Sequence, residues 1–233
     1  MITKDELRRF AAMRGIKSIP LAFLDYIQDK TIYYAFKVNS NLIFKGGTAL
    51  RKLFGSPRMS FDIDFDLAEK RADQIFDEIR KRLINEGFKV MVISSKYIEK
   101  IGTWIEFWQV GKKSLGSYSL GIDISCVKEE PESMEMSLRS PYPDIPPITI
   151  RVQTPRSILV DKIEAFLRRR NVRDLYDIYF LKIKFGFDIK ENVLKDILST
   201  AEKLRREWKG LKNLVSPLPE LKDVLKAIAG EQA

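Results

Sequence analysis

Hydrophobic positions recur along the chain with two different periods, which separate predicted strands from predicted helices. Between Phe61 and Leu67, apolar and acidic residues alternate, as in a strand with one buried face. From about Glu69 to Asn85, apolar residues recur every three or four positions, as on the inner face of an amphipathic helix. Three further strand-like runs follow this helix, at Lys89–Ser94, Thr103–Val110 and Tyr118–Val127.

The first fifty residues carry helix-start signals and one short apolar run. Thr3 and Glu6 have the spacing of a capping box, and Pro20 suits the first turn of a second helix. The apolar run at 42–44 is stopped by two glycines, and residues 48–54 then have a helical pattern. We therefore expect two helices, a short strand and a third helix ahead of the alternating strand.

The pattern changes near residue 128. Residues 128–147 contain five prolines and no periodicity, so we expect a loop or a connection between domains. A last strand is predicted at 148–153, followed by helices at about 156–170, 173–185, 190–208 and 220–229. These elements predict an α/β (α+β) fold, in which a mixed sheet with helices (1–150) precedes a helical domain (151–233).

The amino-acid composition excludes several classes of protein and of catalytic site. The chain is 45% apolar and 31% charged, as in ordinary globular proteins, and it has no apolar run of membrane-spanning length and no signal-peptide pattern. We therefore expect a cytoplasmic protein. With a single cysteine, Cys126, and no histidine, an intramolecular disulfide, the usual zinc sites and Ser-His pairs are excluded. A net charge of +9 favours a polyanionic partner.

The alternating strand carries three aspartates on one face. Asp62, Asp64 and Asp66 share that face because side chains two residues apart in a strand point the same way. Each adjacent pair of carboxylates repels by roughly 2 kcal/mol at an effective dielectric constant of about 20. Such a face is either well solvated or neutralised by a cation.

Two glycines stand fourteen positions or so before these aspartates. Gly46 and Gly47 precede a predicted helix, so its N-terminal N–H groups are free to hold a phosphate, and Thr48 adds a hydroxyl. A plain turn is the alternative for the glycine pair. Combined with Asp-x-Asp on the next strand, however, the segment suits a nucleoside triphosphate and Mg²⁺.

This segment resembles the motif of the nucleotidyltransferase superfamily, and the fuller string resembles the AbiEii subgroup, the toxins of type IV toxin–antitoxin systems. The string consists of residues 46–50 followed by Arg58, Ser60, Asp62, Asp64 and Phe65. The resemblance implies a third carboxylate on a later strand, for which Asp123 is the match and Glu106 the competing candidate; Asp123 alone would otherwise be an exposed strand residue.

The resemblance also implies roles for these residues. Asp62, Asp64 and Asp123 would hold two Mg²⁺ (or Mn²⁺) ions, and Asp123 would assist deprotonation of the acceptor hydroxyl. Asp66 falls outside the motif and is expected to be solvated. The residues implied in nucleotide binding are Gly46, Gly47, Thr48, Arg58, Ser60 and Lys162.

A second constellation lies in the predicted helices at 156–185. Lys162 shares an apolar stripe with Ile158 and Phe166, so it either snorkels to solvent or points into a polar pocket. By resemblance, Lys162 would contact the triphosphate. Residues 168–177 read as an ordinary salt-bridged helix surface or, by the same resemblance, as the acceptor-binding or supporting group of Arg168, Arg169, Arg170, Arg173, Asp174 and Asp177.

The resulting hypothesis is an Mg²⁺-dependent nucleotidyltransferase toxin that moves a nucleoside monophosphate from an NTP to an acceptor hydroxyl. In this hypothesis the acceptor is RNA, including tRNA, or a protein, and a cognate antitoxin is an expected partner. Two other classes remain open at this level: a metal-dependent glycosyltransferase, because Asp-x-Asp also binds nucleotide sugars, and a non-catalytic RNA- or partner-binding module of the same fold.

Overall fold

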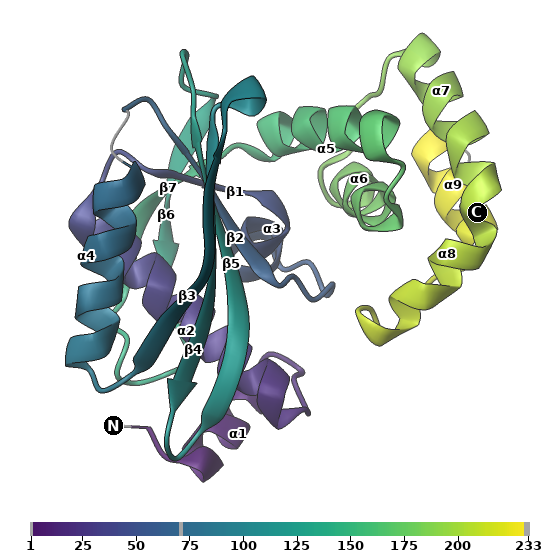
Figure 1. The fold of residues 1–233 in the computed structure, drawn as a ribbon. Helices are drawn as coiled ribbons and strands as arrows, with labels where there is room; N and C mark the ends of the chain where they lie inside the picture. The colour runs from purple at the N-terminus through teal and green to yellow at the C-terminus, as the bar shows by residue number, and fades with distance from the viewer. Residues whose placement is uncertain (1, 70–71, 231–233) are drawn as a thin grey trace. The chain divides into compact units, whose positions relative to one another are not determined.

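The computed structural model describes residues 2–69 and 72–230, and the chain divides into two compact units (Figure 1). The first unit contains Met1–Ala49 and Phe61–Val152, and the second contains Leu50–Ser60 and Gln153–Ala233. Residues 50–60, which the sequence pattern assigns to the first domain, therefore group with the helical second unit. No helix of the described residues is long and apolar enough to cross a membrane.

The first unit is built on a mixed seven-stranded sheet in the described part of the chain, with strand order β3-β4-β5-β2-β1-β7-β6. Strands β2 and β5 are parallel, as are β1 and β7, while β1–β2, β3–β4 and β4–β5 are antiparallel. The bounds are β1 Ile43–Lys45, β2 Asp62–Leu67, β3 Lys89–Ile98, β4 Thr103–Lys112, β5 Gly116–Cys126, β6 Ser133–Leu138 and β7 Ile148–Gln153.

Two helices of the first unit start as predicted from local signals. Helix α1 (Lys4–Ala12) has the Thr3–Glu6 capping box, and α2 (Ile19–Val38) has Pro20 in its first turn. Helix α4 spans Ala72–Asn85; the predicted residues 70 and 71 lie outside the described part of the chain. Helix α3 (Gly46–Phe54) begins at the glycine pair itself, and the boundary between the units falls within it.

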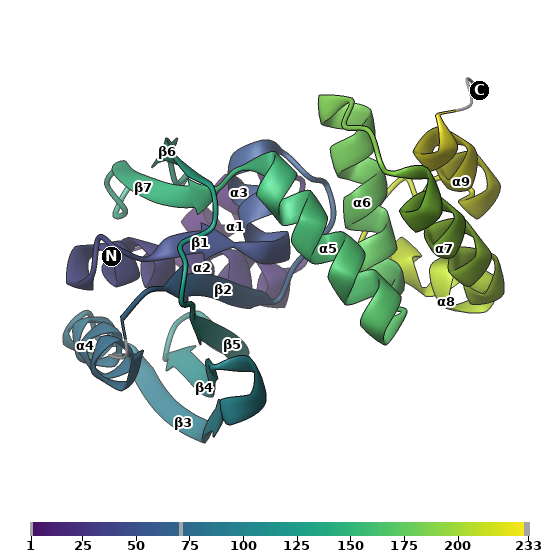
Figure 2. The same cartoon turned by 90° about the horizontal axis from the view of Figure 1, so that it is seen from above.

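Helices α2 and α4 cover the apolar face of the sheet (Figures 1 and 2). The rings of Phe36 on α2 and Phe65 on β2 meet edge-on at 6.0 Å, and those of Phe76 on α4 and Trp108 on β4 at 6.1 Å. Burial of these aromatic side chains supplies the hydrophobic stabilisation of the unit. The aspartates of β2 are left on the opposite face.

The proline-rich stretch is not only a loop, because it contains the edge strand β6. The apolar residues Met134, Met136 and Leu138 do alternate with polar ones, but over only six positions and among five prolines, so the strand was missed.

The second unit is helical, with α5 Pro155–Arg169, α6 Val172–Phe185, α7 Glu191–Ala201, α8 Arg205–Gly210 and α9 Leu221–Ala229. The single helix predicted at 190–208 is wrong, because a 3₁₀ turn at Glu202–Leu204 divides it into α7 and α8. Residues 50–60 pack within this unit: the rings of Phe54 and Phe185 meet at 6.0 Å, and the N–H of Met59 donates to the carbonyl of Leu214 at 2.9 Å.

Candidate active site

Strand register brings the predicted carboxylates onto one face of the first unit. In the parallel pair β2–β5, Asp64 lies opposite Asp123 and Asp62 lies opposite Gly121. Since register partners share a face, Asp62, Asp64 and Asp123 project to the same side of the sheet. The three residues are each partly exposed. Asp62 and Asp64 lie two positions apart in the sequence. Asp123 lies 59 positions after Asp64 and is brought beside them only by the pairing of β2 with β5.

Two glycines leave the room that these carboxylates occupy. A Cβ atom at Gly46 would lie 2.2 Å from Oδ2 of Asp64, and one at Gly121 would lie 2.5 Å from Oδ1 of Asp62. Both distances are far below van der Waals contact. Gly46 also has φ = +77°, which glycine adopts without strain. Gly121 was missed by the sequence analysis, although a glycine inside a strand often marks such a close approach.

The negative charges crowd one another. Burial, followed by the charges of Asp64 and Asp62, raises the pKa of Asp123 to about 7, although Lys45 and Lys96 act in the opposite direction. A carboxyl group whose pKa lies near neutrality is suited to exchanging a proton with a reacting hydroxyl. The same crowding also means that a bound cation would relieve repulsion at this face.

Lys45 is a site residue that sequence reasoning missed. It lies opposite Asp64 in the β1–β2 register, and its ammonium forms an ion pair with Asp66 and lies 3.5 Å from the Ser125 hydroxyl. Asp66 is consequently 2% exposed, so its expected role as a solvated neighbour is wrong. A lysine ending an apolar strand just before the glycine pair was the available signal.

The Thr48 hydroxyl forms a hydrogen bond within the first unit. Thr48 is fully buried, and its hydroxyl donates to the backbone carbonyl of Asp62, which ties α3 to the start of β2. A contact between this hydroxyl and a phosphate stays a prediction, and it would require the hydrogen bond to Asp62 to be exchanged. A phosphate contact at this position is left to the backbone N–H groups of the first turn of α3.

The carboxylate oxygens of Asp62, Asp64 and Asp123 suit a hard divalent cation, but these side chains are not gathered closely enough to hold one. Carboxylate oxygens are the ligands that Mg²⁺ prefers. Within residues 2–69 and 72–230, no group of three acidic, cysteine or histidine side chains is gathered closely enough to hold an ion. Asp62 and Asp64 are separated along the strand by about 6.6 Å, so the three carboxylates converge only if their side chains turn toward one another.

Glu106, the competing candidate for the third carboxylate, instead forms hydrogen bonds and an ion pair within the first unit. It lies beside Ile122 in the β4–β5 register and accepts hydrogen bonds from Ser95 at 2.9 Å and from the Trp108 indole at 2.6 Å. It also forms an ion pair with Arg80 of α4, the helix that covers the apolar face. Glu106 is therefore a buried structural carboxylate on the other side of the sheet.

The second unit contains a buried ionic cluster around Asp177. The guanidinium of Arg58 donates from Nε and Nη2 to the two oxygens of Asp177, both at 2.7 Å. The Lys162 ammonium lies 3.0 Å from Asp177 and 3.3 Å from Asp174. Burial favours the neutral acid, but Lys162 and Arg58 outweigh it and hold the pKa of Asp177 below its usual value.

The contacts of this cluster show which partners several of the predicted site residues have. Lys162 does not snorkel to solvent, because Asp174 and Asp177 hold its ammonium, and its side chain is 12% exposed. Arg58 is 3% exposed and paired with Asp177, so its guanidinium has a structural partner, and a nucleotide contact for it stays a prediction. Asp174 and Asp177 do orient basic side chains, as the resemblance implied.

The remaining predicted residues also belong to the second unit. Arg169 donates to Asp174 at 2.6 and 2.7 Å, whereas Arg168 and Arg170 are exposed and Arg173 is half-buried. Ser60 is almost buried, at 9% exposure. The residues predicted to bind nucleotide are thus divided: Gly46, Gly47 and Thr48 are in the first unit, and Arg58, Ser60 and Lys162 in the second.

Solved structures share this fold. MenT4, a nucleotidyltransferase toxin from Mycobacterium tuberculosis, matches with a TM-score of 0.68 at 20% identity, over 98% of this chain and 89% of that one. JHP933 from Helicobacter pylori matches with a TM-score of 0.61 at 18% identity, over 86% of this chain and 85% of that one. At these identities the likeness shows the fold. A search of curated proteins gives no significant match.

The family itself is shown by the sequence. The family model described as "Nucleotidyl transferase AbiEii toxin, Type IV TA system" matches residues 33–231, which include the glycine pair, the Asp-x-Asp strand, Asp123 and the Lys162 cluster. This match confirms the family resemblance and sets aside the glycosyltransferase alternative. The chain is a nucleotidyltransferase and belongs to the AbiEii toxin family of type IV toxin–antitoxin systems.

Proposed function

We propose that this nucleotidyltransferase moves a nucleoside monophosphate from an NTP to a hydroxyl of an RNA acceptor, and that it requires Mg²⁺ or Mn²⁺. The observation that carries the proposal is the meeting of Asp62, Asp64 and Asp123 on one face of adjacent parallel strands. The close approach of Gly46 to Asp64 places the start of α3 beside these carboxylates. Phosphate and metal ligands are thereby brought together within the first unit.

Each residue has a defined part in this proposal. Asp62, Asp64 and Asp123 hold the divalent cation, which when bound supplies positive charge to the phosphates and offsets the repulsion at this face. The first-turn N–H groups of α3 at Gly46 and Gly47 bind phosphate oxygens. Asp123 also accepts the proton of the acceptor hydroxyl, a role that the family resemblance implies.

Lys162 contributes a positive charge to the triphosphate. Its ammonium is held in place by two fully buried carboxylates, Asp174 and Asp177, so it is pre-organised. The family resemblance is the basis for assigning it to the nucleotide. The toxin activity and a cognate antitoxin partner follow from the same resemblance and belong to the proposal, as does a cytoplasmic location.

Transfer assays with aspartate variants test the proposal. The full chain is incubated with each radiolabelled NTP, Mg²⁺ and total RNA, and label entering RNA is measured. Asp62→Ala and Asp64→Ala are expected to abolish transfer. Their metal-free melting temperatures should stay level or rise, because each substitution removes one charge of a repelling group. Retention of transfer by either folded variant would contradict the metal assignment, and label in protein alone would contradict an RNA acceptor.

A further inference from the structure

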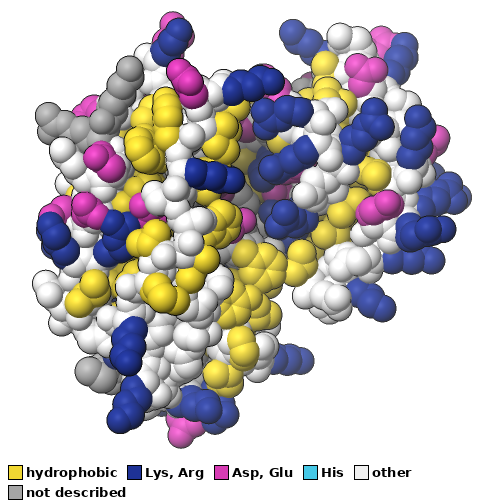
Figure 3. All heavy atoms as spheres, viewed as in Figure 1, with side chains coloured by type: hydrophobic (Ala, Val, Ile, Leu, Met, Phe, Trp, Pro, Cys, Tyr) yellow, Lys and Arg dark blue, Asp and Glu magenta, His cyan; other side chains and the backbone are white. Residues whose placement is uncertain are grey.

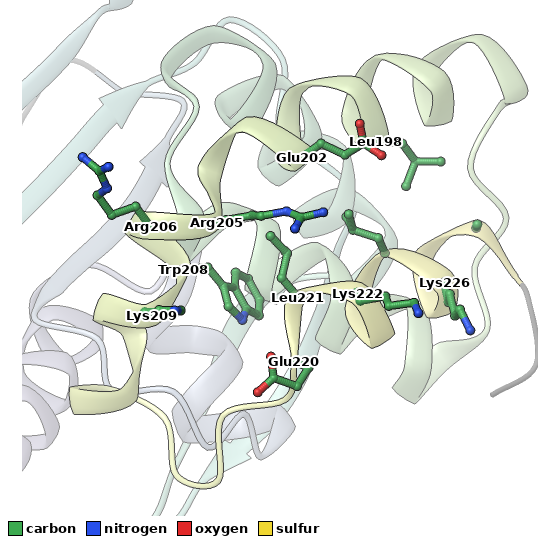
Figure 4. A pocket seen from close by; sticks show the side chains of 12 residues that line it. Leu198, Glu202, Arg205, Arg206, Trp208, Lys209, Glu220, Leu221, Lys222 and Lys226 are labelled. Carbon is green, nitrogen blue, oxygen red and sulfur yellow. The ribbon is translucent and has the colours of Figure 1, made fainter.

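The second unit contains a pocket that none of the candidate site residues lines. It is formed by the ends and faces of α7, α8 and α9 and has a cavity volume of about 660 Å³ (Figure 4). Its apolar lining consists of Leu198, Trp208, Leu221, Leu225 and Ala229, of which Trp208 and Leu221 are buried. The Trp208 N–H donates to the Pro219 carbonyl at 2.9 Å, which fixes the ring. A volume of this size is typical of sites for small organic groups.

Cations surround this apolar lining. Five basic side chains line the pocket together with two carboxylates, Glu202 and Glu220, so the lining carries an excess of three positive charges. The basic residues are Arg205, Arg206, Lys209, Lys222 and Lys226. On the face shown in Figure 3, Lys and Arg side chains are numerous over this unit. Such a concentration of like charge favours an anionic occupant.

The five cations are not needed to neutralise the unit's own acids. The ion pairs described within this unit involve other cations, among them Arg58, Lys162, Arg169, Lys182 and Lys195. Moreover, four of the five basic residues are exposed, and Lys226 is half-exposed. Their charges are therefore available to a ligand.

We propose that this pocket binds the RNA acceptor, with an unpaired base against the apolar lining and its flanking phosphates on the basic rim. This inference rests on the proposed function, of which it specifies the acceptor site. Single-stranded nucleic acids are held in positively charged grooves whose apolar surface contacts the bases, and here the half-exposed side chains of Leu198, Leu225 and Ala229 offer that surface. Glu202 and Glu220 are acceptors suited to the amino groups of a base.

The shape favours RNA over a protein partner. A stable protein interface covers about 800 Å² on each partner, usually on a broad and rather flat surface. A compact cavity of about 660 Å³ with an apolar base instead matches one or two nucleotides. Binding of an acidic protein segment to this pocket is therefore the alternative that the experiment must distinguish.

Binding measurements on the full chain test this inference. The pocket variant carries Lys222→Glu with Lys226→Glu, and the matched control carries Lys190→Glu with Lys195→Glu, at exposed positions that do not line the pocket. Both variants change the net charge equally. The probes are a fluorescein-labelled oligouridylate of about 12 nucleotides and, separately, inorganic polyphosphate and a polyglutamate peptide.

We expect the pocket variant to bind oligouridylate at least about tenfold more weakly than wild type at about 50 mM salt, with a shallower salt dependence, while the control changes by less than about threefold. Polyphosphate should bind wild type more weakly than the oligonucleotide, because it has no base for the apolar lining. Equal losses in both variants, or no loss in either, would overturn the inference. So would a loss for polyglutamate without one for RNA.

Steady-state transfer separates this inference from the proposed function. The pocket variant should raise the KM for RNA by at least about tenfold and leave kcat unchanged, since only ground-state binding is removed. An unchanged KM with normal transfer overturns the pocket but leaves the proposed function intact. If Asp64→Ala transfers normally and the pocket variant still loses RNA binding, the proposed function fails and the pocket stands as an RNA site.

Discussion

Asp123 couples its protonation to folding. Its pKa is about 7 in the folded chain, against about 3.8 for an ordinary aspartate, because of burial and the charges of Asp64 and Asp62. Between these pH values the folded state keeps a proton that the unfolded chain releases. The contribution of Asp123 to the free energy of unfolding is therefore full below about pH 4 and is lost as the pH rises through about 7.

Asp123→Asn removes this titration. We expect the melting temperature of the metal-free wild type to fall between about pH 5 and about pH 8 relative to that of Asp123→Asn, measured by thermal unfolding in a chelator. Asp196→Asn, at an exposed position on α7, serves as the control and should follow the wild-type curve. Parallel curves for wild type and Asp123→Asn would show that this carboxyl group is not perturbed.

Gly46 is required both by its backbone and by its neighbour. At φ = +77° an L-residue is strained by about 1–2 kcal/mol, and a Cβ atom would also displace the Asp64 carboxylate, whose Oδ2 is 2.2 Å away. We expect Gly46→Ala to lower nucleotide transfer by at least about 10²-fold, as misplacement of a reacting group by about 1 Å does.

Gly87 offers a matched control, because it has φ = +81° but nothing within 4 Å of a Cβ atom. Gly87→Ala should cost a similar backbone strain in thermal unfolding and leave transfer unchanged. If both alanine variants have wild-type activity, the close approach between α3 and β2 is not important for the reaction.

At the level of whole elements, the Arg58–Asp177 pair joins the segment 50–60 to α6 within the second unit. Asp177 is fully buried, so removing its charge leaves Arg58 buried without its counter-ion. Asp177→Asn is expected to destabilise the chain by about 3–5 kcal/mol, as measured by denaturant unfolding. Replacing both partners, with Arg58→Met and Asp177→Leu, should recover part of that loss.

The pair Lys182–Asp188 provides the comparison, since Asp188 is in full contact with solvent although the Lys182 side chain is half-buried. Asp188→Asn should leave the denaturation midpoint unchanged. A loss for Asp188→Asn equal to that for Asp177→Asn would show that burial is not the cause of the destabilisation.

Local signals predicted those elements whose causes are local. The capping box of α1, Pro20 of α2 and the alternation in β2 all lie within a few residues, and the family motif added Asp123. Some of what the sequence pattern missed depends on distant partners. The burial of Asp66 needs Lys45 on another strand, and the pairing of Arg58 needs Asp177 on a late helix. The pattern of one element does not contain either contact.

For the whole molecule, the second unit is not a continuous piece of chain. Residues 50–60 belong to it although they lie between β1 and β2, which belong to the first unit. A fragment spanning 153–233 lacks Arg58, Phe54 and Met59, with their contacts to Asp177, Phe185 and Leu214. We expect this fragment to unfold at a markedly lower denaturant concentration than the same unit in the full chain, as followed by circular dichroism. Addition of a peptide spanning 50–60 should raise its midpoint, and an unchanged midpoint for the bare fragment would contradict the division of the chain.

The distance between Arg58 and Asp177 along the chain sets an order of events during protein synthesis. Asp177 follows Arg58 by 119 residues, which a ribosome adds in roughly 6 to 24 s. For that time the segment around Arg58 has emerged without the carboxylate that later encloses its charge. The second unit can close only when most of the chain has been made, so an incomplete nascent chain lacks the Lys162 cluster. On the proposed role of Lys162 at the triphosphate, nucleotide transfer begins only after Asp177, which pairs with its ammonium, has been translated.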